Sequence, residues 1–322
     1  MRRRLPLGWH LAVLVACAVV PMLVFAVVLV ARVTTEERAR EERTLLDVSR
    51  ALAHALDREI LLNVGMLELL AKSPHLAAGD LAAFHAEAQR VVHSRPAWTS
   101  VLLFAADGEQ LVNTMIPWGA PLVRVNDPES LEIVIRTGRP AVGALVAGRA
   151  SGQLAFPVRV PIVRDGRVVY VLTAAVRPQS LQPLLIDAIP PRGEWTRAFS
   201  DRRGVIAARS RDPERFVGQA GTPEFVRRSR SMPEAFYRDT TIDGADAYIA
   251  FSHAAFSGWT AGVAFPVALI DGPVRRSMAL MVGSGLVMVG VTAAAAYVAG
   301  RRIARPIRAA TEAAHALARG ES

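Results

Sequence analysis

Lysine and cysteine are almost absent from this chain of 322 residues: Lys72 is the only lysine and Cys17 the only cysteine. One cysteine excludes a disulfide within the chain, so an exported domain would have to rely on its hydrophobic core for stability. The positive charges are almost all arginines, and the formal net charge is +9. Because these arginines are scattered and no aromatic residues interleave with a basic run, we expect no nucleic acid as a partner.

Sequence motifs of catalysis are also missing. The chain has no glycine-rich phosphate loop with Lys-Ser/Thr, no Gly-x-Ser-x-Gly elbow and no His-Glu-x-x-His pair. His54, His75, His85 and His93 fall on predicted helices without the spacing of metal ligands. We therefore predict no catalytic residue, no metal site and no cofactor.

Two long apolar runs, at residues 11–31 and 279–300, stand out in a sequence that is 52% hydrophobic. At about 1.5 Å per residue, each run would cross the hydrocarbon core of a bilayer as a helix. Arginines at positions 2–4 precede the first run and four arginines at positions 301–308 follow the second, which places both termini in the cytoplasm. The sequence thus predicts a basic cytoplasmic segment over 1–10, two transmembrane helices, and an external segment over 33–278.

A cleaved signal peptide is the alternative for the first run, because it has a basic start and small residues near Ala16 and Ala18. The residues Leu14-Val15-Ala16-Cys17 also resemble a lipoprotein cleavage site. The apolar run continues to Val30, however, where a mature lipoprotein should become polar. We therefore favour an uncleaved transmembrane helix.

The external segment begins with a predicted helix over 34–72. Its apolar residues recur at steps of three and four, which is the pattern of a helix with one buried face. The helix could pack on its own domain, pair with a second subunit, or do both, and we expect both in a homodimer. The positions are Leu45, Val48, Leu52, Leu56, Ile60, Val64, Leu67 and Leu70.

Two α/β units are predicted to follow, over 77–190 and 194–270. Each begins a strand with Trp-Thr, at Trp98 and Trp195. The spacing Asp-Gly-x-x-x-Tyr also occurs in both, starting at Asp165 and at Asp243, and Asp-Gly is a strong hairpin signal. Two related units in tandem explain this pattern better than one large domain.

This arrangement resembles the double Cache family of extracytoplasmic sensors, which carry two PAS-like units on a long N-terminal helix. The residues that carry the resemblance are 98–113, Arg136 to Pro140, 161–170 and Gly258-Trp259. The resemblance implies a membrane-anchored α+β protein: two transmembrane helices flank a tandem PAS-like domain. It also implies a bacterial inner-membrane receptor that works as a dimer, with its sensor domain in the periplasm.

Residues 301–322 look like the first helix of a HAMP linker. Apolar residues there follow alternating steps of four and three, as in a coiled-coil seam, with a proline near the start. A complete HAMP linker has a second helix, so we expect the natural chain to continue beyond Ser322. The predicted signal-transmitting residues are Ile303, Pro306, Ile307, Ala310, Ala314 and Leu317.

The resemblance further implies that the unit over 77–190 binds a small molecule. Arg159 interrupts the apolar strand 156–163, and a buried guanidinium there would need a carboxylate or phosphate, either from the protein or from an anionic ligand. Trp98, Trp118 and Tyr170 could form aromatic walls of the pocket. Amino-acid sensors of the family carry Arg-x-Trp-Tyr, from which Arg95-Pro-Ala-Trp98-Thr99 departs, so the sequence disfavours an amino-acid ligand.

The sequence as a whole predicts the input half of a transmembrane signalling receptor. In this architecture the output is most often a histidine kinase, whereas chemoreceptors and diguanylate cyclases use the same input module. A regulatory membrane protein without kinase and a membrane-anchored periplasmic enzyme are further alternatives. The missing catalytic motifs argue against the enzyme.

Overall fold

A computed structural model describes residues 7–122, 125–149, 151–187 and 195–268, together with 279–280, 282–292, 294–295 and 298. The chain divides into two units, of which residues 41–268 form one and residues 1–40 and 269–322 the other. The predicted linker helix over 301–322, with Ile303, Pro306, Ile307, Ala310, Ala314 and Leu317, lies outside the described residues.

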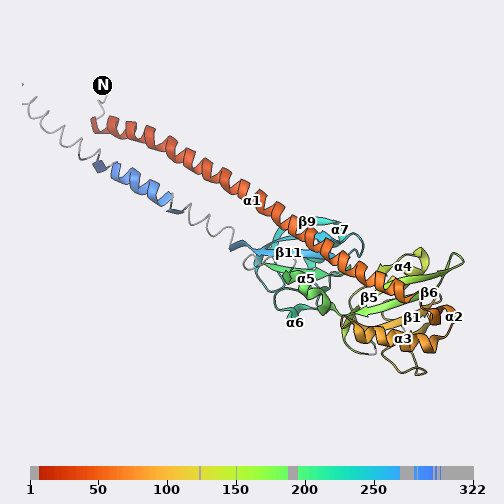
Figure 1. The fold of residues 1–322 in the computed structure, drawn as a ribbon. Helices are drawn as coiled ribbons and strands as arrows, with labels where there is room; N and C mark the ends of the chain where they lie inside the picture. The colour runs from red at the N-terminus through yellow and green to blue at the C-terminus, as the bar shows by residue number, and fades with distance from the viewer. Residues whose placement is uncertain are drawn as a thin grey trace, which may run out of the picture. The chain divides into compact units, whose positions relative to one another are not determined.

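The first element is the helix α1, Leu7–Leu70, coloured red to orange in Figure 1. The sequence predicts two helices here, over 11–31 and 34–72, and the structure joins them into one. The segment between them contains neither glycine nor proline, so nothing in it interrupts the hydrogen bonds of a helix.

No helix in the part of the chain that the structure describes is both long enough and apolar enough to cross a membrane.

The first sheet contains β1 to β6 in the order β2-β1-β6-β5-β3, with β4 paired to β5. A two-residue turn closes its β5–β6 hairpin, whereas the four residues 106–109 join β1 to β2. In the β5–β6 turn Asp165 has φ 49° and Gly166 has φ 73°, the left-handed values that a tight hairpin requires. The strands are β1 (Trp98–Ala105), β2 (Gln110–Asn113), β3 (Ala141–Val142), β4 (Val146–Ala147), β5 (Leu154–Arg164) and β6 (Arg167–Val176).

The second sheet has the order β8-β7-β11-β10-β9, so its strands repeat the topology of the first. Trp98 is the first residue of β1, and Trp195 comes directly before the equivalent strand, β7. The two Asp-Gly turns are not equivalent, because Asp165 joins β5 to β6 whereas Asp243 joins β9 to β10. The strands are β7 (Thr196–Ser200), β8 (Ile206–Arg209), β9 (Glu234–Thr240), β10 (Asp246–His253) and β11 (Thr260–Pro266).

Short helices connect the strands. In the sequence, Asp127 followed by Pro128 predicts the start of a helix and Gly138 its end. The helix α4 does start with Pro128 and end before Gly138, which has φ 61°. The Asp127 side chain accepts its hydrogen bond from the Ser130 hydroxyl, not from a backbone N–H. The helices are α2 (Pro74–Ala78), α3 (Leu81–Ser94), α4 (Pro128–Thr137), η1 (Pro178–Leu181), α5 (Gln182–Asp187), α6 (Pro213–Phe216) and α7 (Pro223–Ser231).

One hydrophobic core joins α1, α3 and one face of each sheet. The Phe156 ring of β5 meets the Trp259 ring edge to face at 4.9 Å, so this core continues from one sheet to the other. The opposite faces pack against other helices: α4 contributes Leu131 and Val134 over the first sheet, and α7 contributes Phe225 over the second. Each sheet therefore has one face on α1 and one face available for a separate pocket.

Candidate ligand-binding pocket

A pocket with about 660 Å³ of empty space, the open solvent at its mouth included, lies on the face of the first sheet that points away from α1. Because side chains alternate along a strand, Ser100, Leu102 and Phe104 of β1 share this face, and Thr173 and Ala175 of β6 lie opposite them. The residues before α4 and those around the β4–β5 connection form the walls. Both walls come from loops placed on a rigid sheet, which is a common arrangement for binding sites.

Arg159 is part of this pocket, and its side chain is buried with 2% exposure. Its Nε donates to Ser130 Oγ at 2.8 Å, Nη1 to Thr173 Oγ1 at 3.0 Å, and Nη2 to the Asp127 carbonyl at 3.1 Å. The guanidinium carbon also lies 5.3 Å from the centre of the Phe104 ring. The sequence left open whether the protein or a ligand supplies the partners of Arg159. In the structure, the protein supplies them.

Burial lowers the pKa of Arg159 to about 10, against the opposing effect of the Asp127 carboxylate. Arg159 is thus still protonated at neutral pH. Asp127, with 2% exposure, accepts the Ser130 hydroxyl, and its Oδ1 lies 3.9 Å from Arg203 Nη2. The Ser130 hydroxyl thus bridges the Arg159 guanidinium and the Asp127 carboxylate. This charged cluster fixes the wall of the pocket.

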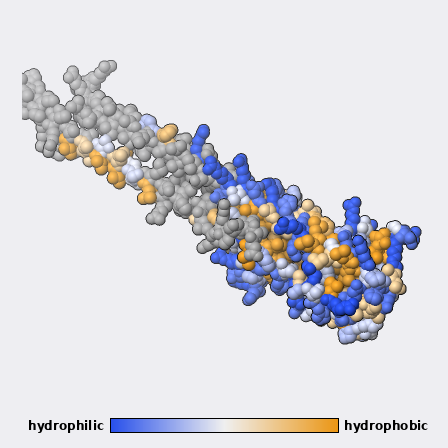
Figure 2. Space-filling view, in the orientation of Figure 1, coloured by the Kyte–Doolittle hydropathy of each residue, from blue (hydrophilic) through white to orange (hydrophobic). Residues whose placement is uncertain are grey.

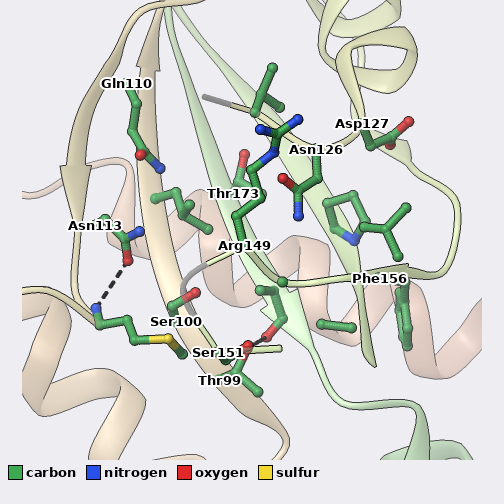
Figure 3. A pocket seen from close by; sticks show the side chains of 18 of the residues that line it. Thr99, Ser100, Gln110, Asn113, Asn126, Asp127, Arg149, Ser151, Phe156 and Thr173 are labelled. Atoms are coloured by element: carbon green, nitrogen blue, oxygen red, sulfur yellow. Dashed lines mark hydrogen bonds between the residues drawn. The ribbon is translucent and has the colours of Figure 1, made fainter. Parts of the chain in front are cut away.

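Arg149 is a second arginine at the pocket, on the loop after β4. It is exposed, and no hydrogen bond or ion pair joins its side chain to any residue that the structure describes. In Figure 3 its side chain extends through the pocket beside Asn126. The Arg149 guanidinium can therefore bind an anionic group of a ligand.

Two oxygen atoms in the pocket wall are buried without a hydrogen-bond donor among the residues that the structure describes: Gln110 Oε1 and Asn126 Oδ1. Gln110 is 8% exposed, and the Nδ2 of Asn126 donates to the Ala147 carbonyl at 2.6 Å. A buried acceptor without a donor lowers the stability of a protein by about 1–3 kcal/mol. A ligand with hydrogen-bond donors that reach both oxygens would satisfy them.

The aromatic residues predicted as pocket walls lie elsewhere, and none belongs to the described lining of this pocket. Trp98 faces α1, where its Nε1 donates to Asn63 Oδ1 at 2.6 Å. Trp118 is 51% exposed, and its ring centre lies 5.7 Å from that of His85. Tyr170 is half-buried on β6, with Arg164 over its ring at 5.9 Å. Of the predicted ligand-binding residues, Arg159 alone contributes to this pocket.

Sequence reasoning missed Arg149, Gln110 and Asn126. Strand alternation could have found Gln110, which lies opposite Phe104 across the β1–β2 pair. Arg149 and Asn126 belong to loops, where no periodicity indicates the direction of a side chain. Within the described ranges, no group of three or more His, Cys, Asp or Glu side chains could hold a metal ion.

Comparison with known proteins gives no matching family model and no matching curated protein. Solved structures do match. The ligand-binding domain of the Pseudomonas fluorescens chemoreceptor CtaA, in complex with L-serine, is 16% identical with a TM-score of 0.54, over 71% of this chain and 98% of that chain. That of Campylobacter jejuni Tlp3, in complex with L-valine, is 15% identical with a TM-score of 0.51, over 74% and 97%.

The extracellular domain of a protein assigned as the histidine kinase rpHK1S-Z16 is 16% identical with a TM-score of 0.51, over 73% of this chain and 98% of that chain. At these identities the likeness concerns the fold. The two-sheet unit of the present chain, on its long N-terminal helix, has the fold of the Cache-like extracellular sensor domains of histidine kinases and chemoreceptors. This confirms the resemblance seen in the sequence.

Proposed function

We propose that this chain is the input half of a bacterial transmembrane receptor, which binds a small extracytoplasmic ligand in the first-sheet pocket. The observation that carries the proposal is the pocket chemistry. Arg149 is a cation without a described partner, and Gln110 and Asn126 present acceptors without donors. A sensor fold explains why such groups are left unsatisfied in the free protein.

The ligand class follows from these groups. A carboxylate matches the guanidinium of Arg149, because arginine can bind it through two parallel hydrogen bonds. Hydrogen-bond donors on the same molecule match Gln110 Oε1 and Asn126 Oδ1. The solved neighbours hold L-serine and L-valine, which carry both kinds of group. We propose a small carboxylate that also donates hydrogen bonds.

Thermal unfolding of the full chain with a panel of amino acids, hydroxy acids and dicarboxylates tests this assignment. A ligand at a hundredfold excess over its Kd stabilises the folded state by about 2.7 kcal/mol. We expect Arg149→Ala to weaken binding by about 10- to 100-fold, the effect of losing a charge-assisted hydrogen bond. The matched control is Arg139→Ala, which removes an exposed arginine outside the pocket and should leave binding unchanged.

The methyl ester of the best-binding carboxylate is the control on the ligand side, because it keeps the shape and removes the charge. We expect it not to bind. Equal binding of acid and ester, or equal affinities of Arg149→Ala and Arg139→Ala, would contradict the proposed site.

For the membrane topology we propose two transmembrane helices, over 11–31 and 279–300, with both termini in the cytoplasm. The apolar runs and their flanking arginines support this arrangement. Reporter fusions at Arg4, Gly152 and Ser322 test it. A periplasmic signal at Arg4 or Ser322 would exclude it.

For the assembly we propose a homodimer in which α1 pairs with α1 of a second copy. Figure 2 shows a mostly hydrophilic surface with apolar areas, and α1 exposes Leu61, Leu62 and Leu69 at 46%, 56% and 69%. Exposed positions along α1, with the half-buried Gly65 among them, also follow a heptad spacing, at Ala51, His54, Arg58, Leu61, Gly65 and Glu68. A cysteine at Leu61 in the Cys17→Ser background should crosslink between copies, whereas one at Leu52, which is 0% exposed, should not.

For transmission we propose that ligand binding moves the second transmembrane helix and the HAMP-like helix after it. The seam of Ile303, Ile307, Ala310, Ala314 and Leu317, with Pro306 near its start, supports this proposal. Cysteines placed along 299–317 should crosslink with a helical period that changes with ligand. The same crosslinking pattern with and without ligand would contradict it.

For the output we propose a sensor histidine kinase. The alternative is a chemoreceptor or diguanylate cyclase, because the solved neighbours include chemoreceptors as well as a histidine kinase. The sequence encoded after Ser322 distinguishes these classes. A phosphoacceptor histidine with an ATP-binding domain supports the kinase, whereas a long heptad helix or a Gly-Gly-Asp/Glu-Glu-Phe motif contradicts it.

A further inference from the structure

A second pocket, with about 570 Å³ of empty space including the open solvent at its mouth, lies on the second sheet. Strands β7, β8, β10 and β11 form its floor, and Thr222 and Phe225 at the start of α7 cover it. Because Phe225 belongs to the cluster with Ile249 and Phe251, this is the sheet face that points away from α1. The second pocket therefore occupies the place on its sheet that the ligand pocket occupies on the first.

The hollow arises from small residues that lie next to one another in the sheet. Gly262 of β11 pairs with Ala198 of β7, and Ala264 pairs with Thr196. A Cβ atom added at Gly262 would meet the Phe225 ring at 3.8 Å, an ordinary van der Waals contact, so the missing side chain leaves room for a small group beneath that ring. Larger side chains, Ile206, Ile249 and Phe225, surround this space and give it mainly apolar walls.

The charged group at this pocket already has protein partners. Arg209 is 3% exposed; its Nη2 lies 2.8 Å from Asp243 Oδ2, and its Nη1 donates to the Arg211 carbonyl at 2.6 Å. Thr222 Oγ1 accepts the Phe225 N–H, and Thr241 Oγ1 bonds to Asp243 and Ala245. An anionic ligand would thus find no cation available in the described lining.

Ser200 differs from these groups. It is 2% exposed and lines the pocket, yet its hydroxyl makes no hydrogen bond to another residue that the structure describes. Buried hydroxyl groups are normally hydrogen-bonded. This hydroxyl can therefore form a hydrogen bond with a ligand in a cavity whose walls are mainly apolar.

We propose that the second pocket binds a neutral, mainly apolar small molecule that carries one hydroxyl or carbonyl group for Ser200. Its apolar part would fill the space above Ala198, Gly262 and Ala264. This site is additional to the ligand pocket of the first sheet and does not depend on it.

The test uses benzyl alcohol, toluene and benzoate, which share a ring and differ in the polar group. In the full chain, Cys17→Ser removes the only natural cysteine and Ile242→Cys places a reporter in the pocket lining. At about ten times its Kd, benzyl alcohol should slow alkylation of the reporter by iodoacetamide about tenfold. Benzoate should not slow it, because its charge would be buried without a partner.

Two variants in the same background locate the bound compound. Ser200→Ala should weaken benzyl alcohol about three- to tenfold, the effect of one neutral hydrogen bond, and leave toluene unchanged. Gly262→Val should fill the cavity and abolish protection by both. Far-UV circular dichroism checks that this variant folds, and Ala264→Val serves as a second filling variant.

Three results would overturn the proposal. In the first, neither benzyl alcohol nor toluene slows alkylation at any concentration up to saturation. In the second, benzoate protects as well as benzyl alcohol does. In the third, protection persists in a folded Gly262→Val or Ala264→Val variant.

Discussion

The two sheets of residues 41–268 have the same strand order and each packs one face on α1, but their pockets differ in charge. The first pocket presents Arg149 and the acceptors of Gln110 and Asn126 without described partners. The second has mainly apolar walls, and in them the buried Ser200 makes no side-chain hydrogen bond to a described residue. The fold thus determines where a cavity forms, whereas a few loop and strand residues determine which class of molecule it can bind.

Each pocket also contains a buried arginine whose guanidinium group is bound by other groups of the protein. Arg159 is bound by Ser130, Thr173 and the Asp127 carbonyl, and Arg209 by Asp243 and the Arg211 carbonyl. Burial of an arginine in a sheet therefore indicates a structural role here. The exposed arginine without a partner is the better indicator of a ligand.

The largest effect on stability should follow from Arg159→Ala. It would leave a cavity and remove the partners of Ser130, Thr173 and Asp127, which we expect to lower the free energy of unfolding by about 3 kcal/mol. Urea unfolding of the full chain, followed by tryptophan fluorescence, measures the change. Arg139→Ala, an exposed site, should change it by less than about 0.5 kcal/mol. Similar values for the two variants would mean that Arg159 is not structural.

The next effect concerns how α1 holds each sheet. The Asp57 carboxylate accepts the Phe256 N–H at 2.7 Å, the Ser257 N–H at 3.0 Å and the Ser257 hydroxyl at 2.8 Å, next to the second sheet. Toward the first sheet, Asn63 accepts one hydrogen bond, from Trp98. We expect Asp57→Ala to cost about 2–3 kcal/mol and Asn63→Ala about 1 kcal/mol. The reverse order in urea unfolding would contradict this comparison.

Arg209→Ala should lower the free energy of unfolding by about 2 kcal/mol, because it leaves the half-buried Asp243 without its cation. Burial acts to raise the pKa of Asp243, but hydrogen bonds from Thr241 and Arg209 hold it below the usual 3.8. Its contribution to stability is therefore complete above pH 3.8 and is lost as the pH falls through the lower, folded-state value. This loss should be smaller in Arg209→Ala. Equal acid sensitivity of the variant and the natural protein would contradict the pairing.

The smallest effect should come from Arg50→Ala. Arg50 contacts both oxygens of Glu234 at 2.9 Å, but the two side chains are 45% and 43% exposed. Solvent screens such a pair, and exposed ion pairs contribute little to stability. We expect the urea midpoint to remain within experimental error. A clear decrease would show that this link between α1 and β9 matters more than its exposure indicates.

Sequence patterns predicted the features that depend on local chemistry and periodicity. The apolar positions from Leu45 to Leu70 do face the core, and Pro128 and Gly138 do bound a helix. The family resemblance correctly gave the fold. The pocket was predicted less well, because Trp98 points to α1 and not to the pocket, and because Arg149 lies in a loop, where its direction depends on tertiary contacts. The partners of Arg159 come from α4 and β6, and no local pattern links them.

A crossed protection experiment tests the account most directly. Two reporters in the Cys17→Ser background, Met115→Cys in the first pocket and Ile242→Cys in the second, are each treated with the best-binding carboxylate and with benzyl alcohol. We predict that the carboxylate slows alkylation only at position 115 and benzyl alcohol only at position 242. Protection of both reporters by one compound, or of the 242 reporter by the carboxylate, would contradict the division of the two pockets by charge.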